Sequence, residues 1–497
     1  MTTRRTFPRQ IGSGGIVLIL VATALTGVAG PAGAAPMCKG MPVTHQAVAG
    51  VLLVGTPGDD VILGSSGADL IDAGDGNDKV CAGDGPDQVD GGAGDDTISG
   101  GPDNDVLQGG QGEDLIHGNR GNDTLTGGAG DDQLFGDQDN DQITGGVGND
   151  LLAGQPGDDT LIDAGGSDTH SGGKGNDTIT DPKGKNTLNG SAGNDTIEGA
   201  GRLGGGGGND QLTGSPGPDE IFGGRGLDDL RGGEGNDDIR GGPGFARIQG
   251  DAGDDEIRAG TGGPTPVIVI DGGAGDDLID VDGFAGEVIG GQGHDVIVGT
   301  GRIRTGSGND SVLTGFDDDT TVDGGDGDDN IFINDALWVV GGNGDDNIHP
   351  WTLEADSTYT ANGGPGNDSV VGSRVAANEL VGDLGDDWIN TFGGSGNHAL
   401  GEAGNDQLFG SPFGIDRLHG GAGSGDSCAG GYIRIDGVEY YNKTDFENDE
   451  IISCELYLPE DFTSRNRLKL EGRWPATGGS PPGATHFADI VAMFKRP

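Results

Sequence analysis

The fold is decided by a nine-residue pattern that is fully stated at Gly91-Gly92-Ala93-Gly94-Asp95-Asp96-Thr97-Ile98-Ser99. It reads G-G-x-G-x-D-x-U-x, where U is a large apolar residue. Outward from this stretch the pattern runs without a break through sixteen repeats, here called laps, from Gly55 to Glu198. One lap cannot bury its apolar residue alone, so laps of this kind stack on their neighbours. The pattern therefore predicts a solenoid in which stacking replaces an ordinary globular core.

The composition agrees with a stacked repeat and excludes some partners. The chain has 497 residues, of which 109 are Gly, and only 5% are aromatic, too few to fill several ordinary cores. Its formal net charge is −55. A chain this acidic repels nucleic acid and anionic lipid and attracts cations. A disordered polyacid is the alternative, but its apolar residues would not recur in strict register.

Position eight of the lap is an apolar column. It is aliphatic in every lap of the first array except one, where His170 takes the place. The residues on either side of it are mostly polar, which is typical of a short strand that points one side chain inward. The sequence therefore predicts strands of three residues that need lateral stacking to form.

Position six of the lap carries an Asp in all but one lap of the first array, where it is Asn186. The glycines before it leave backbone carbonyls uncovered, and calcium prefers a mixture of carboxylate and carbonyl oxygens. Stacked turns lie ~4.8 Å apart, so columns of carboxylates repel unless cations lie between them, and metal binding should be coupled to folding. The candidate ligands of this array, residues 55–198, are Asp60, Asp69, Asp78, Asp87, Asp96, Asp105, Asp114, Asp123, Asp132, Asp141, Asp150, Asp159, Asp168, Asp177 and Asp195.

Two further segments continue the pattern less regularly. Residues 199–258 form a second array, which opens with a shortened lap at 199–204 and in which Ala246 replaces one Asp. Its candidate ligands are Asp210, Asp219, Asp228, Asp237 and Asp255. In residues 259–428 the loops recur once every 15 to 22 residues, which predicts an irregular solenoid with one column of ligands per turn. Its candidate ligands are Asp277, Asp295, Asp310, Asp329, Asp346, Asp368, Asp387 and Asp406.

These residues resemble the RTX, or haemolysin-type, calcium-binding nonapeptide repeat. The resemblance implies an all-β fold, a right-handed parallel β-roll (a β-solenoid) with two nonapeptides per turn. It also implies multiple calcium ions, each held between loops one full turn apart. Asp60 would then pair with Asp78 on one edge, and Asp69 with Asp87 on the other.

Two laps of the first array depart from the pattern. One starts at Asp163 and places His170 in the apolar column, and the other starts at Asp181 and includes Asn186. Laps two apart share an edge, so we expect that edge to bind calcium poorly here. His170 is interpreted as a tolerated defect, with a pH-sensing role as the alternative.

Residues 1–34 have the pattern of a secretion signal. Arg4 and Arg5 precede an apolar stretch at 16–25, and Ala32-Gly33-Ala34 offers a small-residue cleavage site. We therefore expect an extracellular protein. Residues 3–7 also resemble a twin-arginine signal, so the general secretory and twin-arginine routes both stay open. No later stretch has the ~18 apolar residues of a transmembrane segment.

All four cysteines follow the expected cleavage site, and an even number in an exported chain indicates disulfides. Of the three pairings, Cys38–Cys81 and Cys428–Cys454 are favoured because each would staple one end of the solenoid. Residues 35–54 are accordingly predicted to form an N-terminal cap, and residues 429–497 a small C-terminal cap and tail.

No enzymatic function is expected, since the chain has neither an H-E-x-x-H nor a G-x-S-x-G motif and no segment long enough for a separate catalytic domain. The alternative is an adhesive or carbohydrate-active solenoid with a ligand groove in residues 272–410, where Trp338, Trp351 and Tyr359 lie, and a cell-surface or polysaccharide partner. Residues 474–478 resemble a cell-wall sorting motif without its first Leu, which leaves cell-wall association open.

Overall fold

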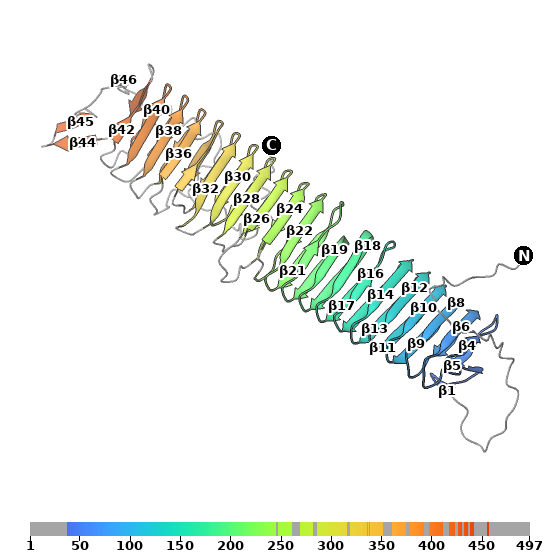
Figure 1. Ribbon diagram of the computed structural model, residues 1–497. Coiled ribbons are helices and arrows are strands. Elements are labelled where there is room, and N and C mark those ends of the chain that lie inside the picture. The colour runs from blue at the N-terminus through green and yellow to red at the C-terminus, as the bar shows by residue number, and fades with distance from the viewer. Residues whose placement is uncertain are drawn as a thin grey trace, which may run out of the picture. The chain divides into compact units, whose positions relative to one another are not determined.

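The computed structural model describes residues 37–244, 247–260, 269–281, 286–315, 319–334, 336, 338–350, 360–373, 378–391, 397–410, 417–422, 426–429, 432–435, 438–441 and 455–456. These residues form strands and turns, and they include no helix that could cross a membrane. The chain divides into two compact units, residues 1–171 and 172–497. Within each unit, parallel strands lie side by side in succession (Figure 1). The predicted all-β solenoid is confirmed.

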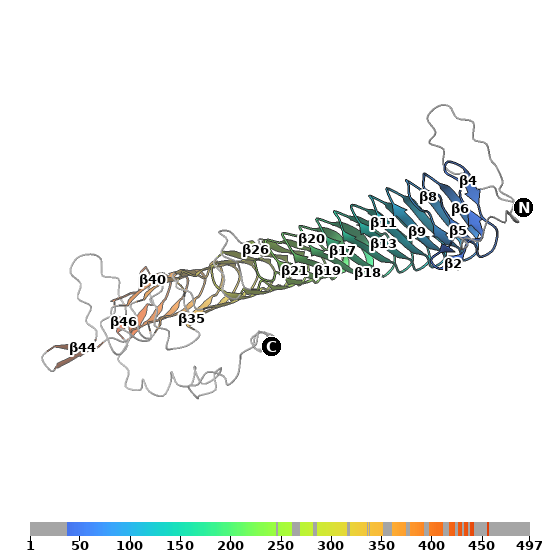
Figure 2. The same ribbon diagram turned by 90° about the horizontal axis from the view of Figure 1, so that it is seen from below.

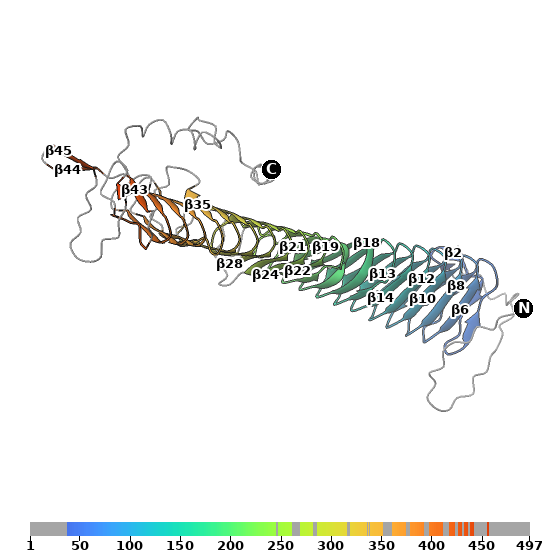
Figure 3. The same ribbon diagram turned by 90° about the horizontal axis from the view of Figure 1, so that it is seen from above.

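From β3 onward, each strand of the first unit pairs in parallel with the strand two places further along the chain, so that alternate strands build two sheets. One sheet contains β3 (His45–Gln46), β5 (Val61–Leu63), β7 (Lys79–Cys81), β9 (Thr97–Pro102), β11 (Leu115–Arg120), β13 (Gln133–Gln138) and β15 (Leu151–Pro156). The other contains β4 (Leu52–Val54), β6 (Leu70–Asp75), β8 (Gln88–Ala93), β10 (Val106–Gln111), β12 (Thr124–Ala129), β14 (Gln142–Val147) and β16 (Thr160–Ile162). Figure 3 shows β6 to β14 of this second sheet following one another, and Figure 2 shows β9, β11 and β13.

The register is eighteen residues, which is two laps per turn. Ile98 of β9 lies opposite Ile116 of β11, and Leu107 of β10 opposite Leu125 of β12. These position-eight side chains are 0–1% exposed, so the apolar column is the core between the two sheets. Burying one such side chain stabilises the fold by roughly 1.5–3 kcal/mol.

The predicted strand length of three residues was wrong for most of this unit, where strands have six residues. β9 continues past Ser99 into the next lap, and Gly101 pairs with Asn119 of β11. The nine-residue pattern assigns the glycines to the loops alone. Their backbone N–H and C=O groups also enter the ladder, because a buried backbone group must find a partner.

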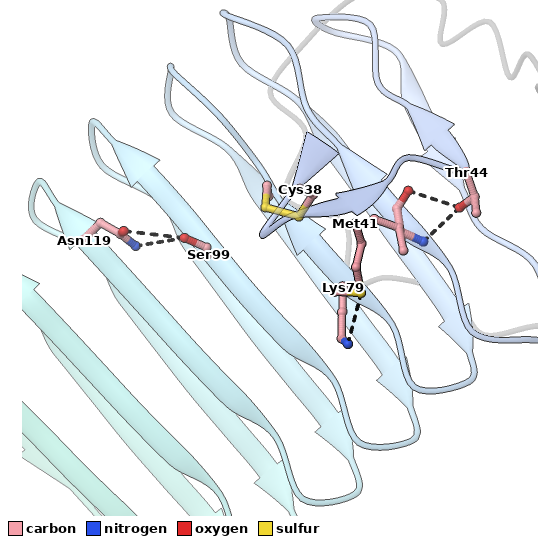
Figure 4. Close-up of a disulfide and its surroundings, with 8 residues drawn as sticks. Cys38, Met41, Thr44, Lys79, Ser99 and Asn119 are labelled. Carbon is pink, nitrogen blue, oxygen red and sulfur yellow. Dashed lines mark hydrogen bonds between the residues drawn. A yellow bond between two sulfur atoms is a disulfide. The ribbon is translucent and has the colours of Figure 1, made fainter. Parts of the chain in front are cut away.

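The N-terminal end of the first unit is covered by a short hairpin. β1 (Met37–Cys38) and β2 (Met41–Pro42) pair antiparallel, and a disulfide joins Cys38 to Cys81 of β7 (Figure 4). Lys79 Nζ also lies 3.5 Å from Met41 Sδ. The predicted Cys38–Cys81 pairing is confirmed. Cys454 lies outside the described residues, so its pairing with Cys428 stays a prediction.

Replacing both Cys38 and Cys81 by Ser should loosen the first turns. The disulfide closes a loop across a sequence separation of 43, and such a loop is worth about 4 kcal/mol by chain entropy. We expect amide hydrogen exchange in β5 and β7 to accelerate at least tenfold, while β13 and β15 serve as internal control. An unchanged rate of hydrogen exchange in β5 would show that the disulfide does not stabilise the stacked turns.

The chain passes from the first unit to the second within β17 (Thr169–Lys174). The second unit begins with two long strands, β18 (Thr178–Ala192) and β19 (Thr196–Gly207). They pair in register up to Asp181 opposite Gly199, and the register then shifts so that Asn186 lies opposite Gly201. The shortened lap at 199–204 is therefore matched by a bulge in the neighbouring strand, and the stacking continues.

Beyond β19 the alternating parallel pattern resumes. The odd-numbered strands are β21 (Glu220–Arg225), β23 (Asp238–Arg240), β25 (Glu256–Arg258), β27 (Leu278–Val281), β29 (Val296–Gly299), β31 (Ser311–Thr314), β33 (Asn330–Ile333), β35 (Asn347–Pro350), β37 (Ser369–Val371), β39 (Trp388–Asn390), β41 (Gln407–Phe409) and β43 (Ser427–Ala429). The even-numbered strands are β20 (Gln211–Thr213), β22 (Asp229–Glu234), β24 (Arg247–Ala252), β26 (Val269–Ala274), β28 (Glu287–Gln292), β30 (Arg302–Ser307), β32 (Thr321–Asp326), β34 (Trp338–Val340), β36 (Thr360–Pro365), β38 (Glu379–Leu384), β40 (His398–Ala403) and β42 (Arg417–His419). The hairpin of β44 (Tyr432–Ile435) with β45 (Val438–Tyr441) and the pairing of β46 (Glu455–Leu456) with β43 follow.

Candidate metal centre

The position-six aspartates of the first unit are connected from turn to turn. The backbone N–H of Asp60 donates to Oδ1 of Asp78 at 2.7 Å, and that of Asp69 to Oδ1 of Asp87 at 2.8 Å. We call each such series an Asp ladder. One ladder contains Asp60, Asp78, Asp96, Asp114, Asp132, Asp150 and Asp168, and the other contains Asp69, Asp87, Asp105, Asp123, Asp141 and Asp159. The structure thus brings the predicted pairs together.

In the interior of these ladders the second carboxylate oxygen has no such partner, whereas Oδ2 of Asp60 and of Asp69, at the start of each ladder, accepts from Thr56 N and Ser65 N. Asp96 and Asp114 are 1–2% exposed, and their Oδ2 atoms are buried without a hydrogen bond. A buried carboxylate oxygen without a compensating contact is costly, and more so when it is charged. The same holds for Oδ2 of Asp78, Asp87, Asp105, Asp123, Asp132, Asp141 and Asp150 in this unit.

Position five, the residue just before each ladder Asp, provides an internal comparison. There too a side-chain oxygen accepts a backbone N–H across one turn, as when Asn77 Oδ1 accepts from Asp95 N at 3.1 Å. Position five is exposed and holds Asn as readily as Asp, for example Asn122 and Asn140. The inter-turn hydrogen bond therefore does not require a charge. The near-constant carboxylate at position six must serve another contact, and it is the unbonded Oδ2 that is available for one.

The glycine at position one leaves the space into which Oδ2 points. A Cβ on Gly91 would overlap Asp96 Oδ2 and would lie 2.7 Å from the carbonyl oxygen of Gly109, one turn further on. A carboxylate oxygen and a carbonyl oxygen from adjacent turns therefore converge beside each such glycine. Calcium takes 6–8 oxygens of this mixed kind at about 2.3–2.6 Å.

Replacing Gly109 by Ala tests this space. The added Cβ would lie 2.7 Å from Asp114 Cγ, so the carboxylate must move, at a cost of about 1–3 kcal/mol, and we expect the loss of about one bound ion per chain. Gly58→Ala is the matched control, since no atom lies within 4 Å of its added Cβ. Equal calcium content in the two variants, measured by elemental analysis, would contradict the assignment of this space to a calcium ion.

Burial shifts the protonation of the ladders. It is the largest cause that raises the pKa of Asp96 to about 7, and the carboxylates of Asp114 and Asp78 raise it further, against the hydrogen bond from Asp78 N. The pKa of Asp141 is likewise raised to about 8, mainly by burial. Without a cation these groups would hold protons near neutral pH, so cations and protons compete for the ladders.

The second unit repeats the arrangement. One ladder contains Asp177, Asp195, Asp210 and Asp228, and the other contains Asp219, Asp237, Asp255, Asp277, Asp295, Asp310, Asp329, Asp346, Asp368, Asp387 and Asp406. The longer ladder tolerates intervals from 15 to 22 residues between successive aspartates. Ala246, Trp351 and Tyr359 lie outside the described residues.

Sequence reasoning missed one member of this ladder. The backbone N–H of Asp406 donates to Oδ1 of Asp426 at 3.2 Å, and Asp426 is 1% exposed with an unbonded Oδ2. The loop from Gly420 carries one extra residue before its Asp, so the strict nine-residue count passed over it. Its signal was the Gly420-Gly421 pair, nineteen residues after Gly401.

The opposite edge of the late second unit carries neutral buried groups. Asn378 N donates to Oδ1 of Asn397 at 2.9 Å, the same bond that joins the aspartates, and Asn378 Nδ2 reaches that oxygen at 3.1 Å and Ser373 O at 3.2 Å. An amide supplies its own donor where a carboxylate cannot. The hydrogen bonds of the Asn378–Asn397 pair are therefore made without a cation, whereas the Asp ladders fit calcium.

Comparison with protein families agrees with calcium as the ion that the carboxylate and carbonyl oxygens of the Asp ladders would hold. The family model of the RTX calcium-binding nonapeptide repeat (4 copies) matches residues 54–89, 82–116, 90–125, 108–143, 144–179, 183–201, 204–239, 240–263 and 392–412. No curated protein matches the chain.

Proposed function

The chain carries RTX calcium-binding nonapeptide repeats, and from this premise we propose that it is an exported structural or interaction protein whose folding is coupled to binding many calcium ions along its Asp ladders. The role is that of a scaffold, without a catalytic centre. The ions would bridge successive turns, each held by Asp carboxylates and loop carbonyls.

One observation supports this proposal above all: the row of buried, unbonded Oδ2 atoms. Each ladder places like charges on successive turns, for example Asp96, Asp114 and Asp132. Nothing within a turn neutralises them, and the neutral Asn378–Asn397 pair shows that the fold can make the same inter-turn bond without charge. Cations between the turns would remove this repulsion, and ligand binding to the folded state alone stabilises it.

Export is supported by the N-terminal pattern of residues 1–34 and by the Cys38–Cys81 disulfide, since disulfides persist in oxidising compartments. Extracellular fluids also supply the calcium that a multi-site scaffold needs. Coupled folding would then delay assembly of the roll until the chain has left the cell.

Circular dichroism of the full chain, titrated with calcium and in parallel with magnesium, tests the proposal. We expect the strand signal to be absent in chelator and to rise cooperatively with calcium. Magnesium should be much weaker, because its strict octahedral geometry suits these loops poorly. A strand signal already complete in chelator would refute coupled folding, and an equal response to magnesium would refute calcium as the ligand.

A second candidate role, adhesion to a polysaccharide, rests on outward aromatic side chains in the second unit. Phe332 and His349 lie with ring centroids 4.4 Å apart, Trp388 and Phe409 5.6 Å apart, and Trp338 is 53% exposed. Aromatic faces of this kind bind sugar rings. If so, Trp388→Ala should weaken retention on the polysaccharide that the parent chain binds, whereas Phe135→Ala in the first unit should not.

A further inference from the structure

The lap at residues 163–171 differs from its neighbours at two positions that meet in space. Asp163 stands where the laps on either side have Gly154 and Gly172, and His170 stands where they have Leu161 and Ile179. In the structure both side chains are fully buried, and His170 Nε2 lies 3.9 Å from Asp163 Oδ2. That separation is too long for a hydrogen bond.

A third and a fourth group complete the cluster. One ligand atom each of Asp163, Asp168 and His170 lie within 4.8 Å of one another, and each residue is at most 2% exposed. Asp168 Oδ1 accepts from Asp150 N at 2.8 Å, which places the ladder beside the cluster. Asp150 Oδ2 and Asp163 Cγ would lie 2.6 and 3.0 Å from the same point, a Cβ on Gly145.

The orientation of Asp163 points to a bound cation. Its Oδ1 accepts from Ala164 N at 2.7 Å and Gly146 N at 3.3 Å, which holds the carboxylate in place. Its Oδ2 is buried without a hydrogen bond and faces the imidazole, and Oδ2 of Asp150 is likewise unbonded. Carboxylates buried together in this number need bound protons or a cation between them, and a nearby imidazole adds a nitrogen donor for a cation.

We propose that Asp163, Asp168 and His170 form a site for a zinc-class ion, distinct from the calcium sites of the regular laps. Calcium binds oxygen, whereas imidazole nitrogen combined with carboxylate oxygen suits zinc and similar transition metals. Two zinc donors at about 2.0–2.1 Å in a tetrahedral site lie about 3.3 Å apart, so the 3.9 Å between His170 Nε2 and Asp163 Oδ2 must shorten by roughly 0.6 Å when the ion binds. Asp150 or a water completes the tetrahedron. The lap that the sequence marks as defective for calcium is thus specialised for a different metal.

Cobalt(II) is the probe, because its visible absorption reports nitrogen coordination, with zinc competition as confirmation. The untagged full chain, saturated with calcium, should bind one Co²⁺ with a tetrahedral d–d spectrum that one equivalent of Zn²⁺ abolishes. His170→Leu and Asp163→Gly restore the residues of the regular laps, so neither should impair folding, and each should lower Co²⁺ affinity at least a hundredfold.

His117→Ser is the matched control, because His117 lies on the outer side against Phe135 and Asp137, and Ser99 occupies the equivalent place one turn earlier. It should leave the cobalt spectrum unchanged. Circular dichroism of the same calcium-loaded samples separates loss of this site from loss of the fold. Cobalt binding that survives both His170→Leu and Asp163→Gly, or a calcium-saturated parent that binds no cobalt, would overturn the proposal.

Discussion

Acidification should restore strand structure to the calcium-free chain. At pH 8 the chain freed of calcium by chelation and gel filtration is expected to lack the strand signal, and at pH about 5 to regain most of it. Burial, above all, raises the pKa values of Asp277, Asp329 and Asp368 to about 8 in the folded state, from an ordinary value of 3.8. Protonation removes the buried charge that calcium otherwise neutralises.

The direction in which the stability of the calcium-free fold changes with pH follows from proton binding. Between pH 3.8 and about 8 the folded calcium-free state holds more protons than the unfolded state, so its stability falls as the pH rises. This contribution is complete below the unfolded pKa and is lost as the pH passes through the folded values. With saturating calcium the dependence should reverse, because protons compete with the metal.

General charge repulsion is the rival explanation, since the chain carries a net charge of −55 at pH 7. About 1 M salt at pH 8 distinguishes the two, because it shortens the Debye length to about 3 Å and screens exposed charges but not buried ones. We expect salt alone to leave the calcium-free chain without strand signal. Full recovery in salt, or no recovery in acid, would contradict the role of the buried ladders.

Neutralising one stretch of a ladder should make that stretch independent of calcium. In the triple variant Asp96→Asn, Asp114→Asn and Asp132→Asn, each Oδ1 remains as acceptor while the charge disappears. We expect the loss of on the order of four bound ions, one for each gap touched, which elemental analysis measures. The calcium-free fold should become more stable at pH 8, since a buried amide can be satisfied where a buried charge cannot. Urea denaturation of the calcium-free chain, followed by circular dichroism, measures this second effect.

The matched control removes the same charge from the same edge at position five. In Asp59→Asn, Asp95→Asn and Asp131→Asn the side chains are exposed, and their oxygens keep accepting backbone N–H groups from the next turn. The number of bound calcium ions and the calcium concentration at the midpoint of the folding titration should match those of the parent chain. If the control lost as many ions as the ladder variant, net charge and not position six would govern binding.

Most of the fold could be predicted because the repeat is local. Ile98 and Leu107 occupy the same phase of successive laps, and stacking identical phases buries one continuous column. The pairing of Asp60 with Asp78 and of Asp69 with Asp87 follows from the resemblance to the RTX repeat, which has two laps per turn, and the structure contains both pairs. The nine-residue pattern misjudged the strand length, since the N–H and C=O groups of glycines join a ladder only once a neighbouring turn is present, as Gly101 does with Asn119.

Irregular positions could not be assigned in this way. Asp426 joins its ladder despite an extra residue in the loop, and the 199–204 lap is compensated by a bulge after Asp181. A strict count places neither, because loops on a solenoid edge absorb inserted residues without disturbing the strands between them.

By itself the sequence determined the nine-residue repeat, the inward column and the residues that line up in the Asp ladders, since each depends only on which residue returns at a fixed interval. Only the tertiary structure decided which carboxylate oxygens remain without a partner and which irregular residues meet. Oδ1 is used by a backbone N–H one turn away, so Oδ2 alone is left for a metal. Likewise Asp163 and His170, seven positions apart in the chain, become neighbours only because the turn folds both into the interior.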